Sequence, residues 1–124
     1  MTANEVMSEF GMYSPNTLDE ALKYKWLSNA ERHVVEILNS YKTDEDYEVV
    51  ELSPETDGDY KLAAQEPYSE LYKYYLLAQI NLLYGDTAKY NVFASLYGNE
   101  LDSFRLWCVR KYRSKNEITQ LGVI

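Results

Sequence analysis

The chain has 124 residues, of which 46% are hydrophobic and 15% aromatic, and its formal net charge is −8. This composition predicts one folded domain, since disordered chains are poor in hydrophobic and aromatic residues. The negative charge argues against general nucleic-acid binding, and no apolar run approaches the roughly 20 residues of a membrane span. We expect a soluble protein made in the cytoplasm, and the single cysteine excludes an internal disulfide.

The first part of the chain predicts two helices. Residues 2–10 have Val6, Met7 and Phe10 on one side, and Gly11 is expected to end this short helix. Thr17 and Glu20 have the spacing of a capping box, which predicts the start of a second helix that runs to about residue 41. Five apolar residues of that helix recur every three or four positions: Leu27, Ala30, Val34, Ile37 and Tyr41. Leu22 and Trp26 extend this face towards the start of the helix.

The next segment is acidic. Residues 43–60, here called the acidic segment, contain eight acids and no lysine or arginine: Asp44, Glu45, Asp46, Glu48, Glu51, Glu55, Asp57 and Asp59. Residues 47–52 and 59–62 are each typical of a short strand, and Pro54 and the Asp57-Gly58 pair are turn signals. Either a small β-hairpin or a long loop fits this pattern.

Residues 66–113 predict a helical hairpin with a tight turn at residues 84–86, because Pro67 suits a first helical turn and Gly85 suits a helix end. Large residues of the second helix fall on one face: Phe93, Tyr97, Leu101, Phe104 and Cys108. The first helix has a wider apolar face, so we expect it to lie between neighbours: Leu71, Tyr72, Tyr75, Leu76, Ala78, Ile80, Leu82 and Leu83.

These elements predict an all-α fold, a small bundle of one short and three longer helices. We expect a single domain over residues 1–113 and a tail over residues 114–124, whose final Leu121, Val123 and Ile124 either pack back or are held for a partner. A basic run without acids lies near the end of the chain: Arg105, Arg110, Lys111, Arg113 and Lys115. The molecule is therefore expected to be electrically polarised.

Signals for catalysis or metal binding are weak. His33 is the only histidine and is expected to be a partly exposed helical residue rather than a general base, and Cys108 is expected to be a buried structural thiol. The acids at 44–48 and 57–59 do not match a calcium loop, and no phosphate-binding or nucleophile motif is present. We expect no enzyme activity and no cofactor or metal.

Tyrosine is the compositional oddity, with 13 copies. A tyrosine side chain combines a large apolar ring with a polar hydroxyl, so it suits the edge of a core or a partly wet protein interface. Base stacking is the alternative, which the negative net charge disfavours.

About four fifths of the chain resembles the head-tail connector family of tailed phages and prophages of Gram-positive bacteria, also called head completion or adaptor proteins. The resembling residues are Pro15-Asn16, Lys25-Trp26-Leu27, Glu66-Pro67-Tyr68, Glu70-Leu71-Tyr72, Ala78-Gln79-Ile80, Tyr84-Gly85, Lys89-Tyr90-Asn91, Phe104 and Trp107. These are helix-packing patterns rather than catalytic signatures. The acidic segment and the last 11 residues lie outside the resemblance.

The resemblance implies a structural protein of the virion that forms a ring below the portal, joins head to tail, and is assembled in the host bacterial cytoplasm. Its implied partners are copies of itself, the portal protein and a tail or head-closure protein, with no specific nucleic acid and no membrane. Two roles compete for the acidic segment: pairing with the basic run of the next copy around the ring, or repelling DNA in the channel. The candidate interface residues are Asp44, Glu45, Asp46, Glu48, Glu51, Glu55, Asp57, Asp59, Arg105, Arg110, Lys111 and Arg113.

Two other classes are weighed against this one. A helical-hairpin adaptor that binds a protein or peptide is the runner-up, since residues 83–94 faintly resemble one tetratricopeptide unit, although that architecture needs stacked repeats. A small DNA-binding regulator is disfavoured by the acidic composition.

Overall fold

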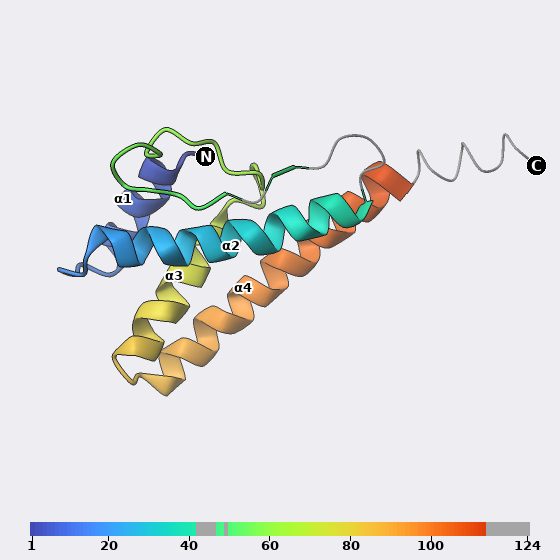
Figure 1. The fold of residues 1–124 in the computed structure, drawn as a ribbon. Helices are drawn as coiled ribbons and strands as arrows, with labels where there is room; N and C mark the ends of the chain where they lie inside the picture. The colour runs from blue at the N-terminus through green and yellow to red at the C-terminus, as the bar shows by residue number, and fades with distance from the viewer. Residues whose placement is uncertain (42–46, 49, 114–124) are drawn as a thin grey trace, which may run out of the picture.

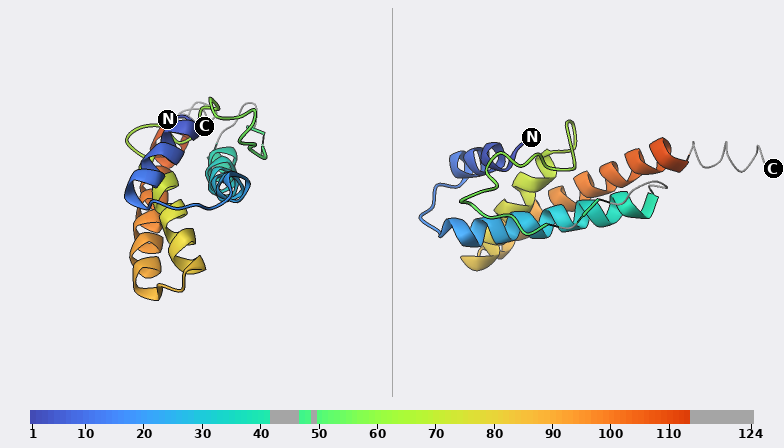
Figure 2. Two further views of the ribbon diagram at one scale, coloured as in Figure 1. Left: turned by 90° about the vertical axis from the view of Figure 1, so that its left-hand side faces the viewer. Right: turned by 45° about the horizontal axis from the view of Figure 1, so that its top comes forward.

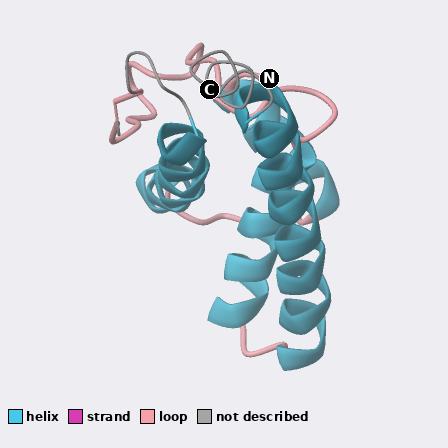
Figure 3. Cartoon of the chain, turned by 90° about the vertical axis from the view of Figure 1, so that its right-hand side faces the viewer, coloured by secondary structure: helices cyan, strands magenta, loops and turns pink. Residues whose placement is uncertain are grey.

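The computed structural model describes residues 1–41, 47, 48 and 50–113. Its helices are α1 (Ala3–Tyr13), α2 (Glu20–Tyr41), α3 (Glu70–Leu83) and α4 (Thr87–Cys108), and α4 continues into a π-helical turn, η1 (Val109–Arg113) (Figure 1). The described residues contain no strand, as the colouring of Figure 3 also shows. The predicted all-α bundle of one short and three longer helices is therefore confirmed.

Helices α3 and α4 form the predicted hairpin. Gly85 has a positive φ of 76° in the turn, a conformation that glycine adopts without a Cβ penalty. The carboxylate of Asp86 then caps α4 by accepting a 3.1 Å hydrogen bond from the amide of Lys89. Figure 2, left, shows the turn of this hairpin projecting well beyond α1 and α2, so the tip is not covered by the other helices.

The core lies where α1, α2 and the first half of α3 meet. Its fully buried side chains include Val6 and Phe10 of α1, Leu27 and Val34 of α2, and Leu76 of α3. Helix α4 contributes less, because only Phe104 and Cys108 near its end are buried. Phe93, Tyr97 and Leu101 are partly buried against the core, so the predicted apolar face of α4 is fully covered only near the end of the helix.

Three predicted helix boundaries are wrong. Helix α1 continues through Gly11 to Tyr13, because Gly11 does not adopt the left-handed conformation in which glycine ends a helix. Helix α2 starts at Glu20, and the carboxylate of Asp19, rather than the hydroxyl of Thr17, accepts a 3.1 Å hydrogen bond from the amide of Ala21. Pro67 precedes α3 in a turn instead of occupying its first turn.

The described part of residues 47–69 is a long connection of turns and coil, not a hairpin. A single antiparallel bridge joins Lys61 to Thr2, and the carbonyls of Gly58 and Tyr60 accept hydrogen bonds of 2.9 and 3.0 Å from the amides of Asn4 and Ala3. The connection therefore runs back along α2 and ties down the start of α1 (Figure 1). Residues of the connection pair with the start of the chain, as Lys61 does with Thr2, and not with each other. The strand-like sequence here therefore forms no strand.

A buried carboxylate holds the end of this connection. Oε1 of Glu31 accepts a 2.6 Å hydrogen bond from the hydroxyl of Tyr72, and Oε2 accepts a 2.9 Å hydrogen bond from the amide of Ala63. The Tyr72 oxygen in turn accepts a 2.9 Å hydrogen bond from the amide of Ala64. Glu31 and Tyr72 are both 0% exposed. This network joins α2, α3 and the connection through polar groups that are paired in the core.

Candidate protein interface

The described acids of the acidic segment lie on the connection beside α1 and α2. Glu51 forms a 2.7 Å ion pair with Arg32 of α2, and Glu48, Glu55 and Asp59 are exposed. Asp57 is half-buried, and its carboxylate accepts a 2.7 Å hydrogen bond from the amide of Ser53. Asp44, Glu45 and Asp46 lie outside the described residues.

The basic candidates lie at the other end of the molecule. Arg105, Arg110 and Lys111 are exposed on the last turns of α4 and on η1, which Figure 1 places at the far end from α1. Arg105 lies 3.4 Å from the carboxylate of Asp102, one turn earlier on the same helix. The backbone of Arg113 belongs to η1.

Within one molecule, therefore, the described acids nearest α1 do not meet the basic candidates of α4 and η1. The hydrogen bonds of Gly58 and Tyr60 place the loop around Asp57 and Asp59 beside α1, whereas η1 contacts the end of α2. The exposed Asp59 beside α1 is therefore far from Arg110 and Lys111 of η1, whereas the exposed Glu48 follows Tyr47, which lines a pocket together with Lys111. The separation of Asp59 from these bases suits contacts between copies better than contacts within one copy.

The sequence did not indicate that part of the α3 apolar face is uncovered. We call this surface the hairpin tip, defined by Leu82, Leu83 and Tyr84 with Val92 and Leu96 of α4. Leu82, Leu83 and Tyr84 are 54% to 60% exposed, and Val92 is 57% exposed. Exposed apolar side chains gathered on one projecting element are typical of a protein contact site.

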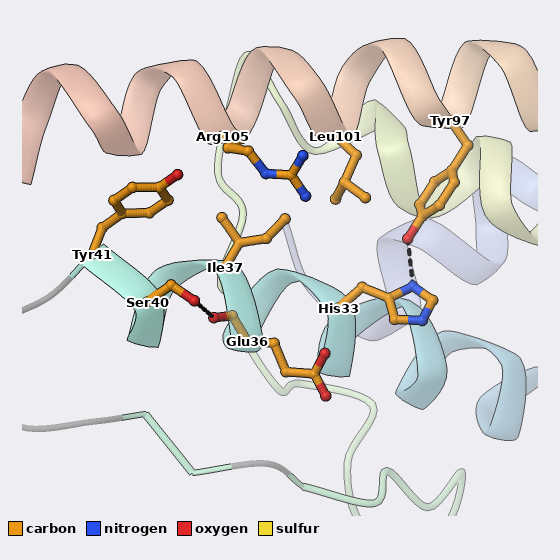
Figure 4. A pocket seen from close by; sticks show the side chains of 8 residues that line it. All are labelled: His33, Glu36, Ile37, Ser40, Tyr41, Tyr97, Leu101 and Arg105. Atoms are coloured by element: carbon orange, nitrogen blue, oxygen red, sulfur yellow. Dashed lines mark hydrogen bonds between the residues drawn. The ribbon is translucent and has the colours of Figure 1, made fainter.

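A groove of about 500 Å³ runs between α2 and α4 (Figure 4). Its lining residues are His33, Glu36, Ile37, Ser40, Tyr41, Tyr97, Leu101 and Arg105. Nδ1 of His33 is 2.7 Å from the hydroxyl oxygen of Tyr97, and the two groups share a hydrogen bond. Burial raises the pKa of Tyr97 above its ordinary value of 10.0, so the phenol stays protonated at neutral pH.

Among the residues that the structure describes, none offers His33 a carboxylate partner in this groove. Figure 4 shows the carboxylate of Glu36 pointing away from α4 and the His33 ring turned towards Tyr97. A histidine that acts as a general base is usually oriented by an acid, whereas here a tyrosine hydroxyl occupies Nδ1. The expectation that His33 is a partly exposed helical residue agrees with its intermediate burial.

The thiol of Cys108 is fully buried, as predicted. Burial raises its pKa to about 11, which leaves very little reactive thiolate at neutral pH. No group of three or more potential metal ligands occurs among the residues that the structure describes. None of the described helices combines the length and the hydrophobicity that a bilayer span requires.

The sequence reasoning missed the contact between His33 and Tyr97 and the burial of Glu31. Glu31 lies four positions after Leu27 and four before Val35, on the apolar face of α2, and this spacing was the available signal. No matching spacing connects His33 with a residue 64 positions later. Comparisons of the chain with protein-family models, with curated proteins and with solved structures found no match.

Proposed function

We propose that this chain is a structural assembly protein of the head-tail connector type, which forms a ring with copies of itself and joins a phage portal to a tail or head-closure protein. The single observation that supports it most is the separation of the exposed Asp59, beside α1, from the exposed Arg110 and Lys111 of η1 at the far end of α4. In a ring built by head-to-tail contacts, the acidic end of one copy meets the basic end of the next.

The hairpin tip adds a second contact surface to this proposal. The turn of the hairpin projects away from α1 and from η1 (Figure 2), and Leu82 and Leu83 beside it are exposed. A ring closed by the charges would therefore still present apolar side chains to another component. We assign this surface to the portal or to the head-closure protein. Assembly would take place in the host bacterial cytoplasm and end in the virion, without an enzyme activity, a cofactor or a specific nucleic acid.

The test uses charge reversal at the basic end. Replacement of Arg110 and Lys111 by glutamate is expected to abolish rings in electron micrographs of the chain mixed with the portal protein encoded beside it. The matched control reverses two exposed lysines elsewhere, Lys25→Glu and Lys89→Glu, with the same change in net charge. If rings persist in the first variant, charge pairing between copies is excluded as the ring contact. The other role of the acidic segment, repulsion of DNA in the channel, is then favoured.

The second candidate function is a helical adaptor for a protein or peptide, and the groove between α2 and α4 favours it. An adaptor would stay monomeric with the portal protein and would bind a partner segment along this groove. Failure of the unmodified chain to form rings on any portal, together with a partner cross-linked to the groove, would replace the connector proposal by this one.

A further inference from the structure

A second, smaller pocket lies where the connection before α3 meets the end of α4. Its volume is about 270 Å³, and five of its eleven lining residues are aromatic: Tyr47, Tyr68, Phe104, Trp107 and Tyr112. Lys111 and Glu66 supply its two charged side chains. We call this the aromatic pocket. It shares no residue with the groove between α2 and α4.

The π-helical turn η1 shapes one wall of this pocket. The rings of Trp107 and Tyr112 are in edge-to-face contact with centroids 6.4 Å apart, although the two residues are five positions apart in the chain. In an α-helix of 3.6 residues per turn, residues five apart lie on different faces, so this contact depends on the wider turn. Single π-helical turns of this kind are frequent at functional sites.

The aromatic pocket already holds a cation. Nζ of Lys111 lies 4.7 Å from the centre of the Trp107 ring and 5.3 Å from that of Tyr112, both within cation–π distance. The Lys111 side chain is exposed and flexible, and it belongs to the pocket wall itself, so it can leave without disturbing the backbone. A cation from another molecule can then take its place over the two rings.

We propose that the aromatic pocket binds an arginine side chain presented by a partner protein. A guanidinium is planar and stacks on aromatic rings better than an ammonium, and it can form two hydrogen bonds with one carboxylate. Glu66, which is exposed among the pocket residues, supplies that carboxylate. This inference does not depend on ring formation or on the connector proposal.

The experiment measures binding of short blocked peptides to the full chain by tryptophan fluorescence. The variant Trp26→Phe leaves Trp107 as the only tryptophan, so the signal reports the aromatic pocket alone. The probe is acetyl-Ser-Gly-Arg-Gly-Ser-amide. Three matched peptides carry citrulline, glutamate or proline at the central position, and citrulline has nearly the shape of arginine without its charge.

We expect saturable binding of the arginine peptide and about 5- to 30-fold weaker binding of the citrulline peptide, the range that cation–π energies give. Lys111→Met is expected to strengthen arginine binding several-fold because it removes the competing cation. Glu66→Gln, an exposed change that leaves the aromatic packing intact, is expected to weaken it several-fold. Tyr112→Leu, which removes the second ring and keeps Trp107 as the reporter, is expected to weaken arginine binding several-fold, with the folded state checked by circular dichroism.

Three results would each overturn the proposal. If the glutamate peptide binds more tightly than the arginine peptide and Lys111→Met weakens its binding, the pocket is an anion site. Equal binding of the proline and arginine peptides would make it an apolar site without charge selection. If the arginine peptide binds saturably neither to the Trp26→Phe protein nor to its Lys111→Met variant, the pocket is not a binding site and Lys111 only fills it.

Discussion

The hydroxyl of Tyr72 donates a 2.6 Å hydrogen bond to the carboxylate of Glu31, and neither side chain is exposed to solvent. This contact joins residues 41 positions apart, on α3 and α2. The same carboxylate accepts the amide of Ala63, so one buried acid fixes the end of the connection against two helices. Such a group is expected to influence stability more than any single surface ion pair.

The first prediction concerns the loss of one partner from this network. Tyr72→Phe keeps the ring and removes the hydroxyl, which leaves Glu31 with one donor fewer and the amide of Ala64 without its acceptor. Each buried group left unpaired costs about 1–3 kcal/mol, so we expect a loss of about 2–4 kcal/mol in the free energy of unfolding. Urea unfolding monitored by circular dichroism measures it. Tyr90→Phe, at a less buried position, is the matched control and is expected to change stability by less than about 0.5 kcal/mol.

The second prediction is a dependence of stability on pH that originates at Glu31. Burial raises the pKa of Glu31 above its ordinary value of 4.5, although the hydrogen bonds from Tyr72 and Ala63 oppose this shift. A raised pKa means that the folded state holds the proton more tightly than the unfolded state. The stabilisation is therefore fully present below pH 4.5 and is lost as the pH rises through the folded-state pKa.

The variant Glu31→Gln isolates this effect, because glutamine has the same size and does not titrate. As the pH rises from 4.5 towards neutrality, the free energy of unfolding of the unmodified protein is expected to fall relative to that of the variant. A difference that stays constant over this range would show that the carboxyl group titrates alike in the folded and unfolded states.

The third prediction compares two glycines. Gly85→Ala forces a side chain into a left-handed conformation with a φ of 76°, which is expected to cost about 1 kcal/mol. Gly98 lies inside α4, and an added Cβ there would meet nothing within 4 Å. Gly98→Ala is therefore expected to stabilise the protein by about 0.5–1 kcal/mol. Thermal unfolding measures both changes in stability. A lower midpoint for Gly85→Ala and a higher one for Gly98→Ala would support the turn geometry, and changes in the same direction would contradict it.

The fourth prediction concerns close packing between the connection and α1. A Cβ at Gly58 would lie 2.7 Å from Nδ2 and Oδ1 of Asn4, so Gly58→Ala must displace that side chain. The displacement would break the 3.3 Å hydrogen bond that the hydroxyl of Tyr24 donates to Asn4. We expect a cost of about 1 kcal/mol that shrinks when Asn4→Ala is already present, and a double-mutant cycle measures this coupling.

The helices could be predicted from local spacing, whereas their limits and the polar core could not. The face of α2 that includes Leu27, Ala30 and Val34 follows from its period alone, and all three are buried. The continuation of α1 through Gly11 to Tyr13 could not be predicted, because glycine is a common helix end and only the fold shows that Gly11 keeps a helical conformation.

The candidate interface was predictable as a charge pattern but not as a surface. Sequence spacing identified the acids and bases, yet only the fold shows that Glu51 is paired with Arg32 inside the molecule. The apolar run of α3 predicts burial for Leu82 and Leu83, but both are exposed because the hairpin extends past its neighbours. Exposure at the end of a helix depends on the lengths of the elements packed beside it, which are tertiary information.

The last prediction uses this exposure to separate assembly from folding. Leu82→Ser with Leu83→Ser removes apolar surface that is already more than half exposed, so the free energy of unfolding is expected to change by less than about 1 kcal/mol. Leu76→Ala, at a fully buried position of the same helix, is the contrasting control and is expected to cost about 2–5 kcal/mol.

If the hairpin tip docks on the portal, the serine variant folds normally and forms fewer portal complexes in electron micrographs, because the apolar contact is lost while the charged ends are unchanged. Normal portal complexes from the serine variant would exclude the tip as a docking surface and leave the charged ends as the remaining candidates.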